Sequence, residues 1–307
     1  MPRGLRTHLD AFEARLNDAL PGPAKVGFLT LYLFSTATSD RLDAVADHPA
    51  WDRWADAGVA ALVGLQVAGM ALISVAAWRG VRGTRATALN DPVNAVAVPG
   101  VNDFMPVAAA PYVVAGLVVA TVVHEAGHAL ACRRANVGVE EWGVALLFGV
   151  VPVAAYVLPD DAIDDASVRA NLRMYSVGVF HNLVVAVAAT GLLLSSFTAA
   201  PPDPYMTYFG WVLVGGTPPT PGMVASLGVL TNFCFWLALL NANFAVLNAL
   251  PVSIFDGGRV LSLALRESAD RVGVTISPVV ESAVVNGATL LALVLVVLAL
   301  VGPALPV

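Results

Sequence analysis

Five stretches of the chain are long and apolar enough to cross a lipid bilayer. Each has about 20 residues with few charges, the length that a transmembrane helix requires. A sixth stretch, 24–39, is shorter and ends among serine and threonine residues, so the sequence leaves open whether it spans the membrane. The five long stretches are 57–78, 109–132, 174–197, 224–247 and 279–301. This pattern predicts an all-α polytopic membrane protein with about six transmembrane helices.

Two other stretches have a different hydrophobic pattern. The run Trp142–Leu158 is rich in valine and is interrupted by Gly149 and Pro152, which favours a re-entrant segment or a β-hairpin. An ordinary bent membrane helix is the alternative, because non-helical backbone at membrane depth is tolerated only where protein shields it. Residues 5–20 place leucine and phenylalanine at helical spacing among charges, which is typical of a helix lying on the membrane interface.

Composition supports a membrane protein and excludes a nucleic-acid partner. Hydrophobic residues make up 58% of the 307 residues, charged residues only 12%, and the mean hydropathy is +0.76. Soluble domains carry about 25% charged residues. The net charge of −6 offers no basic surface for a polyanion. Both cysteines, Cys132 and Cys234, lie in apolar runs, so no disulfide framework is expected.

The arginines orient the second half of the chain. The connections 133–173 and 251–278 contain arginines, whereas 198–223 contains none. Because cytoplasmic loops are enriched in basic residues, the first two connections are expected in the cytoplasm and the third outside. The first half follows the same rule only if 24–39 does not span, and the sequence does not decide this point.

A candidate metal site lies near the end of the apolar stretch 109–132, in the sequence His124-Glu-Ala-Gly-His128. Residues i and i+4 share one face of a helix, so both imidazoles can bind one metal ion. Glu125 lies about 100° around the helix axis, where it can reach a metal-bound water without binding the metal. This spacing is typical of zinc hydrolases, and two hydrogen-bonded histidines near a helix end are the alternative.

Asp256 is the best candidate for a third ligand. A catalytic zinc ion takes three protein ligands and keeps one position for water. Pro251 ends the preceding helix, and two glycines after Asp256 permit a tight turn back towards the histidines. Asp256 can also cap a short helix over 258–267, and both roles can hold at once.

These motifs resemble those of the site-2 protease family (peptidase family M50), zinc metalloproteases that cleave substrates within the membrane. The resemblance rests on the histidine motif, on Asn248-x-x-Pro-x-x-x-x-Asp-Gly257, and on Gly178-x-x-x-Asn182, and it covers about 96–260. The run 98–102 is similar to the eukaryotic-type branch. Connection 198–223 is too short for the PDZ domain that many members carry.

The resemblance implies an activity and a role for each residue. One zinc ion per chain would be bound by His124, His128 and Asp256, and Glu125 would act as general base and acid in the hydrolysis of transmembrane protein substrates. Asn182 is a candidate donor to the substrate backbone or the oxyanion, and a hydrogen bond between helices is its alternative role. His181 is a second candidate there, and it is expected to be a packing partner rather than a fourth ligand.

The predicted organisation has three parts. They are an N-terminal region (1–108) with the interfacial helix and one or two membrane segments, a catalytic membrane core (109–260) and a C-terminal membrane helix region (261–307). The expected location is the cell membrane, with the active site near the cytoplasmic side. A non-proteolytic transporter that binds a metal with the same residues is the competing function, but a transport site has no need of Glu125.

Overall fold

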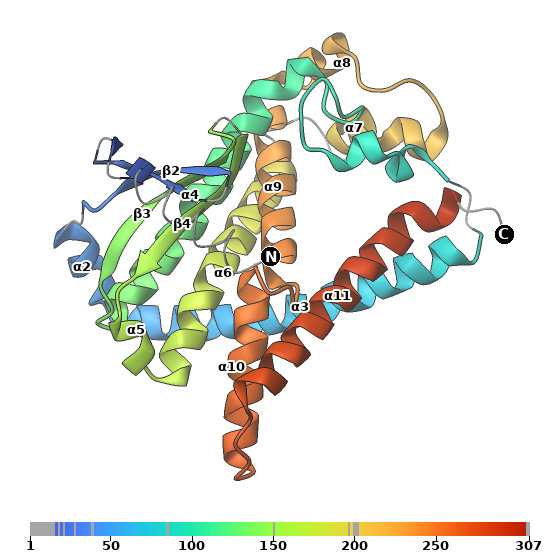
Figure 1. Ribbon diagram of the computed structural model, residues 1–307. Helices are drawn as coiled ribbons and strands as arrows, with labels where there is room; N and C mark the ends of the chain where they lie inside the picture. Colours follow the sequence, from blue (N-terminus) through green and yellow to red (C-terminus); the bar gives the residue numbers. More distant parts are fainter. Residues whose placement is uncertain are drawn as a thin grey trace.

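The computed structural model confirms a mostly helical membrane protein with a small antiparallel sheet (Figure 1). The structure describes residues 16–17, 19–20, 22–27, 29–37, 40–83, 86–149, 151–195, 197–198 and 203–304. Within these ranges, 5 helices are long and apolar enough to cross a membrane. They are α3 (Ala50–Val81), α4 (Ala110–Arg134), α6 (Val168–Leu193), α9 (Gly228–Ala249) and α11 (Pro278–Val301). They correspond in order to the five long apolar stretches of the sequence.

The stretch 24–39 forms strands, so it does not supply a sixth membrane helix. β1 (Ala24–Gly27) pairs with β2 (Thr30–Ser35), and β2 pairs with β3 (Val139–Leu147). β3 and β4 (Val151–Pro159) form the hairpin predicted for 142–158. All pairs are antiparallel, and the order in the sheet is β1-β2-β3-β4. Most of the predicted interfacial helix over 5–20 lies outside the described residues.

Helices α4, α6 and α9 form the centre of the molecule and pack against one another (Figure 1). Small residues let two of these helices approach closely: a Cβ added at Gly127 of α4 would lie 3.0 Å from the backbone nitrogen of Gly178 of α6. The sheet lies beside α4. α3 contacts α6 and α9 and then runs along α11. Two polar residues where these helices meet, His124 of α4 and Asn182 of α6, are therefore buried.

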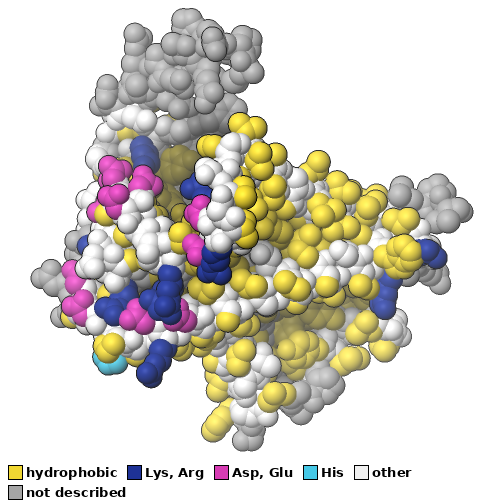
Figure 2. Space-filling view, turned by 90° about the horizontal axis from the view of Figure 1, so that it is seen from below, with side chains coloured by type: hydrophobic (Ala, Val, Ile, Leu, Met, Phe, Trp, Pro, Cys, Tyr) yellow, Lys and Arg dark blue, Asp and Glu magenta, His cyan; other side chains and the backbone are white. Residues whose placement is uncertain are grey.

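Ion pairs join three helices at one end of this group. Asp52 of α3 binds Arg134 of α4 at 2.6 Å and Arg173 of α6 at 2.7 Å. Asp56, one turn further along α3, binds Arg173 at 2.8 Å and Arg169 at 2.7 Å. Figure 2 shows acidic and basic side chains gathered on one part of the lower face, while hydrophobic side chains cover much of the rest. The N-terminal end of α3 thus lies at the same end of the molecule as the C-terminal end of α4.

The remaining elements are short, apart from one amphipathic helix. α10 (Asp256–Arg271) follows the break after α9 and carries most of its polar residues on one side. α7 (Asp203–Val214) and α8 (Pro221–Ser226) occupy much of the connection 198–223. The other elements are α2 (Asp40–Ala46), α5 (Ala162–Asp165), and 3-10 turns at Ala88–Asn90, Pro92–Ala95, Val107–Ala109 and Gly302–Ala304.

Candidate metal centre

His124 and His128 lie one turn apart on α4, with their imidazoles facing each other. The two Nε2 atoms are 3.1 Å apart, and His124 is buried. Both side chains are enclosed because α6 crosses α4 at this point. The i, i+4 spacing in the sequence therefore places two nitrogen atoms at one point inside the helix group.

Asp256 reaches this point from a different part of the chain. α9 ends at Ala249, Leu250 is extended, and α10 begins at Asp256. The carboxylate Oδ2 of Asp256 lies 3.1 Å from Nε2 of His124 and 3.4 Å from Nε2 of His128. The three side chains can each offer one ligand atom, and these atoms lie within 4.8 Å of one another.

The two possible roles of Asp256 can now be compared. Phe255, not Asp256, is the N-cap of α10, and no side chain caps this helix end. Asp256 is the first helical residue, where a negative charge is favourable beside the free N–H groups. Its position thus combines a favourable place on α10 with proximity to both histidines.

Hydrogen bonds fix which nitrogen of each imidazole carries the proton. Nδ1 of His128 lies 2.7 Å from the carbonyl oxygen of Met174. A carbonyl can only accept, so Nδ1 of His128 carries hydrogen, and in the neutral imidazole Nε2 then presents a lone pair. Nδ1 of His124 lies 2.7 Å from Oδ1 of Asn182, with the same consequence.

The orientation of the Asn182 amide is itself determined by its neighbours. Its Nδ2 donates to the carbonyl oxygen of Ala120 on α4 at 2.8 Å and to Oδ1 of Asn241 on α9 at 2.9 Å. Its oxygen therefore faces His124. Asn182 is fully buried. Both of its amide hydrogens are used in hydrogen bonds between helices, which was the alternative to a contact with the substrate.

This donor set fits a metal ion. Two Nε2 lone pairs and Oδ2 of Asp256 converge, and Oδ2 is buried without a hydrogen-bond partner. With both imidazoles neutral, three acceptors face one point, and they repel one another unless a cation lies among them. Two imidazoles and one carboxylate form a ligand set that catalytic zinc sites use, and three protein ligands leave one position open.

Glu125 is placed beside this group and not within it. Its side chain is partly exposed, and it makes no hydrogen bond or ion pair with any residue that the structure describes. Its neighbour in sequence, His124, faces the centre, so Glu125 projects from an adjacent part of the α4 surface. The carboxylate of Glu125 therefore lies outside the group of three candidate ligand atoms.

His181 lies outside the three-residue group. Its Nδ1 is 3.0 Å from the carbonyl oxygen of Val123, and its ring packs against Trp51 and Trp54 of α3 at centroid distances of 6.1 and 5.9 Å. The structure thus places His181 in the contact between α3, α4 and α6.

Gly178 belongs to the site although it has no side chain. A Cβ at this position would lie 2.8 Å from Nε2 of His128 and 3.0 Å from Nδ1 of His124. Real Cβ atoms do not approach so closely, so the glycine leaves room for both imidazoles. The sequence motif contained Gly178, but its spacing alone did not show what the glycine contacts.

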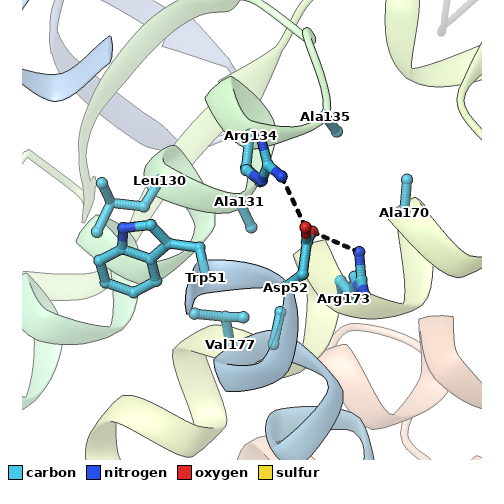
Figure 3. A pocket seen from close by; sticks show the side chains of 10 residues that line it. Trp51, Asp52, Leu130, Ala131, Arg134, Ala135, Ala170, Arg173 and Val177 are labelled. Carbon is cyan, nitrogen blue, oxygen red and sulfur yellow. Dashed lines mark hydrogen bonds and ion pairs between the residues drawn. The ribbon is translucent and has the colours of Figure 1, made fainter. Parts of the chain in front are cut away.

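A pocket of about 170 Å³ lies between α3, α4 and α6 (Figure 3). Leu130 and Ala131 of its wall follow His128 on α4 within one turn, and Val177 directly precedes Gly178. Asp52, paired with Arg134 and Arg173, forms the polar part of the wall (Figure 3). The pocket is therefore mostly apolar, with one group of paired charges in its wall.

A comparison of the sequence with known protein families points to the same type of site. Residues 112–295 match the model of peptidase family M50. No solved structure matches the chain. The matched range contains both histidines, Glu125, Asn182 and Asp256, and it covers more than half of the chain. The chain belongs to peptidase family M50, the site-2 protease family of membrane metalloproteases.

Proposed function

We propose that the protein is an intramembrane zinc metalloprotease that hydrolyses peptide bonds of transmembrane protein substrates. The observation that carries this proposal is the convergence of two Nε2 lone pairs with the unpaired Oδ2 of Asp256. Membership of the family supports a metallopeptidase. Zinc, one ion per chain, is the metal that best suits two imidazoles and one carboxylate.

Each residue then has a chemical task. Bound zinc supplies an activated water at neutral pH and polarises the peptide carbonyl. Glu125 accepts a proton from the attacking water and delivers it to the leaving amine. His124, His128 and Asp256 would hold the metal. Because both imidazoles are neutral and only Asp256 is negatively charged, the site with Zn²⁺ bound keeps a net positive charge. Gly178 leaves room for the imidazoles.

Asn182 acts through His124 in this proposal. Both amide hydrogens of Asn182 are bonded within the protein, so its Oδ1 faces Nδ1 of His124. This contact keeps the His124 ring in the orientation in which Nε2 can bind the metal. Partners that orient a metal-binding histidine in this way are common in metalloenzymes. His181 supports the contact between α3 and α6 and does not bind the metal.

Strand β4 is the proposed docking edge for an unwound substrate. In the described sheet β4 pairs with β3 on one side only, and it contacts α4. A helical substrate hides its amide groups, so it must become extended before cleavage. An extended segment can hydrogen-bond to a free strand edge.

The proposed active site lies near the cytoplasmic side of the cell membrane. The arginine-containing connections 133–173 and 251–278 support this orientation. Asp52 and its arginine partners, Arg134 and Arg173, form a charged group at the same end of the molecule.

Substitution of Glu125 by glutamine tests the function. Glu125→Gln keeps size and removes the base, so zinc content should stay at the wild-type value while cleavage of a single-span substrate falls by about 10²–10⁴. The measurement pairs metal analysis with gel-based cleavage in proteoliposomes. Cleavage at the wild-type rate would overturn the mechanism. Zinc binding without cleavage by the wild-type protein on a panel of single-span substrates would favour the metal-binding transporter.

A further inference from the structure

Gln66 is a polar residue in the middle of α3, outside the range that matches the family. Its Nε2 donates to the carbonyl oxygen of Ala249 at 3.0 Å and to the carbonyl oxygen of Gly257 at 2.9 Å. Both partners can only accept, so the orientation of the Gln66 amide is determined. One NH₂ group thus joins the last residue of α9 to the second residue of α10.

The carbonyl of Ala249 needs this donor because α9 ends there. In a continuing helix it would accept from the backbone N–H of Ser253. That N–H instead donates to Oγ1 of Thr289 on α11 at 2.9 Å. A buried carbonyl left without a donor is costly, and Gln66 supplies the missing hydrogen.

The second partner lies directly beside a proposed metal ligand. Gly257 follows Asp256, and a Cβ at Gly257 would overlap the carbonyl oxygens of Ala249 and Leu250. The start of α10 therefore lies directly against the end of α9. A change in the distance between these two ends moves the backbone of Asp256 relative to the histidines.

Packing on both sides of Gln66 fixes the position of its backbone. Leu62, one turn before, is fully buried against Val179, Ala245 and Val260. Three residues after it, a Cβ at Gly69 would lie 3.2 Å from Cδ2 of Leu250. The point on α3 from which the Gln66 side chain extends is therefore fixed by the packing of the helix.

We infer that Gln66 is a positioning residue for Asp256: its amide ties the end of α9 to the start of α10 and so fixes the carboxylate at the distance that the metal requires. The inference rests on the proposed metal site. It gives the first membrane helix, which lies outside 112–295, a defined part in the geometry of that site.

The test uses two variants of the full chain. Gln66→Met keeps the length of the side chain and removes both donors, whereas Gln66→Glu keeps its shape and can donate at most one hydrogen bond. We expect zinc affinity, measured by competition with a chelator, to fall about 10- to 100-fold in Gln66→Met and by less in Gln66→Glu. The visible spectrum of Co²⁺ bound in place of zinc should change in Gln66→Met, because the carboxylate has moved.

Two controls remove polar groups from membrane helices at other places. The first control is Ser74→Ala. Ser74 lies on α3, and its Oγ donates to the carbonyl oxygen of Met70 in the same helix. Asn243→Leu removes an amide on α9 that bonds the carbonyl of Leu239 in its own helix. Both should keep the wild-type zinc affinity and cobalt spectrum, which separates positioning from a general loss of stability.

The outcomes distinguish the inference from the proposed function. Wild-type zinc affinity and an unchanged cobalt spectrum in Gln66→Met overturn the inference and leave the protease proposal intact. Weaker zinc binding in Gln66→Met supports the inference even if Glu125→Gln turns out to cleave normally, which would overturn only the protease mechanism.

Discussion

Asn182 and His124 are joined by a hydrogen bond of 2.7 Å between Oδ1 and Nδ1, and this bond leaves Nε2 of His124 free to bind a metal. The bond links α6 to α4. The same amide also donates to Ala120 and Asn241. A residue that the sequence offered as a substrate contact thus lies behind a proposed metal ligand, and both of its amide hydrogens are bonded within the protein.

The first prediction concerns Asn182→Leu. The variant removes the acceptor that holds His124 in place, so zinc affinity should fall about 10- to 100-fold. Equilibrium dialysis against a zinc buffer measures this change. Asn232→Leu is the matched control, because Asn232 is also buried and bonds Tyr208 and Val224 away from the metal centre. Unchanged zinc affinity in Asn182→Leu would contradict the role of Asn182 in positioning His124 and would favour a contact with the substrate.

The second prediction concerns Gly178→Ala. The added Cβ would lie 2.8 Å from Nε2 of His128, so α6 or the imidazoles must move. We expect a loss of zinc and a destabilisation of about 1–3 kcal/mol, as in other overpacked sites. Thermal unfolding in detergent and metal analysis report both effects.

Gly191→Ala is the control for this substitution on the same helix. A Cβ at Gly191 meets no atom within 4 Å. Alanine is also the better helix former, by about 1 kcal/mol. Gly191→Ala should therefore keep its zinc and its stability, and an equal loss in both variants would contradict the steric explanation.

Local spacing explains which features the sequence could predict. His124 and His128 share a helix face at any position in the fold, and Pro251 interrupts α9 whatever surrounds it. Gly149 and Pro152 indicated that the apolar run 142–158 is interrupted, and they left a re-entrant segment and a β-hairpin both open. Each of these features depends on residues that are close in the chain.

Contacts between distant residues could not be read from spacing. Gln66 bonds carbonyl groups that lie 183 and 191 residues further along the chain. Asp52 and Arg173 are separated by 121 residues. Hydropathy also could not separate the strands within 24–39 from a short membrane helix, because both are short apolar runs.

The third prediction concerns the proposed ligands. His124→Ala, His128→Ala and Asp256→Ala should each bind much less zinc than the one ion per chain expected for the wild type, because two protein ligands do not form a stable catalytic site. His48→Ala is the control, since His48 is exposed and its Nδ1 accepts from the backbone N–H of Ala50 at 3.2 Å. Full zinc content in Asp256→Ala would remove this residue from the ligand set.

The last prediction concerns orientation in the membrane. Reporters placed in 133–173 and 251–278 should be cytoplasmic, and a reporter in 198–223 extracytoplasmic. The structure adds a stricter expectation for the connection between α3 and α4. Because Asp52 at the start of α3 pairs with Arg134 at the end of α4, these two ends lie on one side of the membrane, and the connection 86–106 lies on the other.

This expectation opposes the local charge, because Arg79 and Arg82 at the end of α3 would by themselves favour a cytoplasmic position. Residues 24–27 and 30–35 form strands, so the described part of this stretch supplies no additional span before α3. A reporter at 86–106 should therefore be extracytoplasmic in the wild type. Cytoplasmic labelling there, together with cytoplasmic labelling of 133–173, would mean that α4 does not cross the membrane, and the proposed position of the active site would then be wrong.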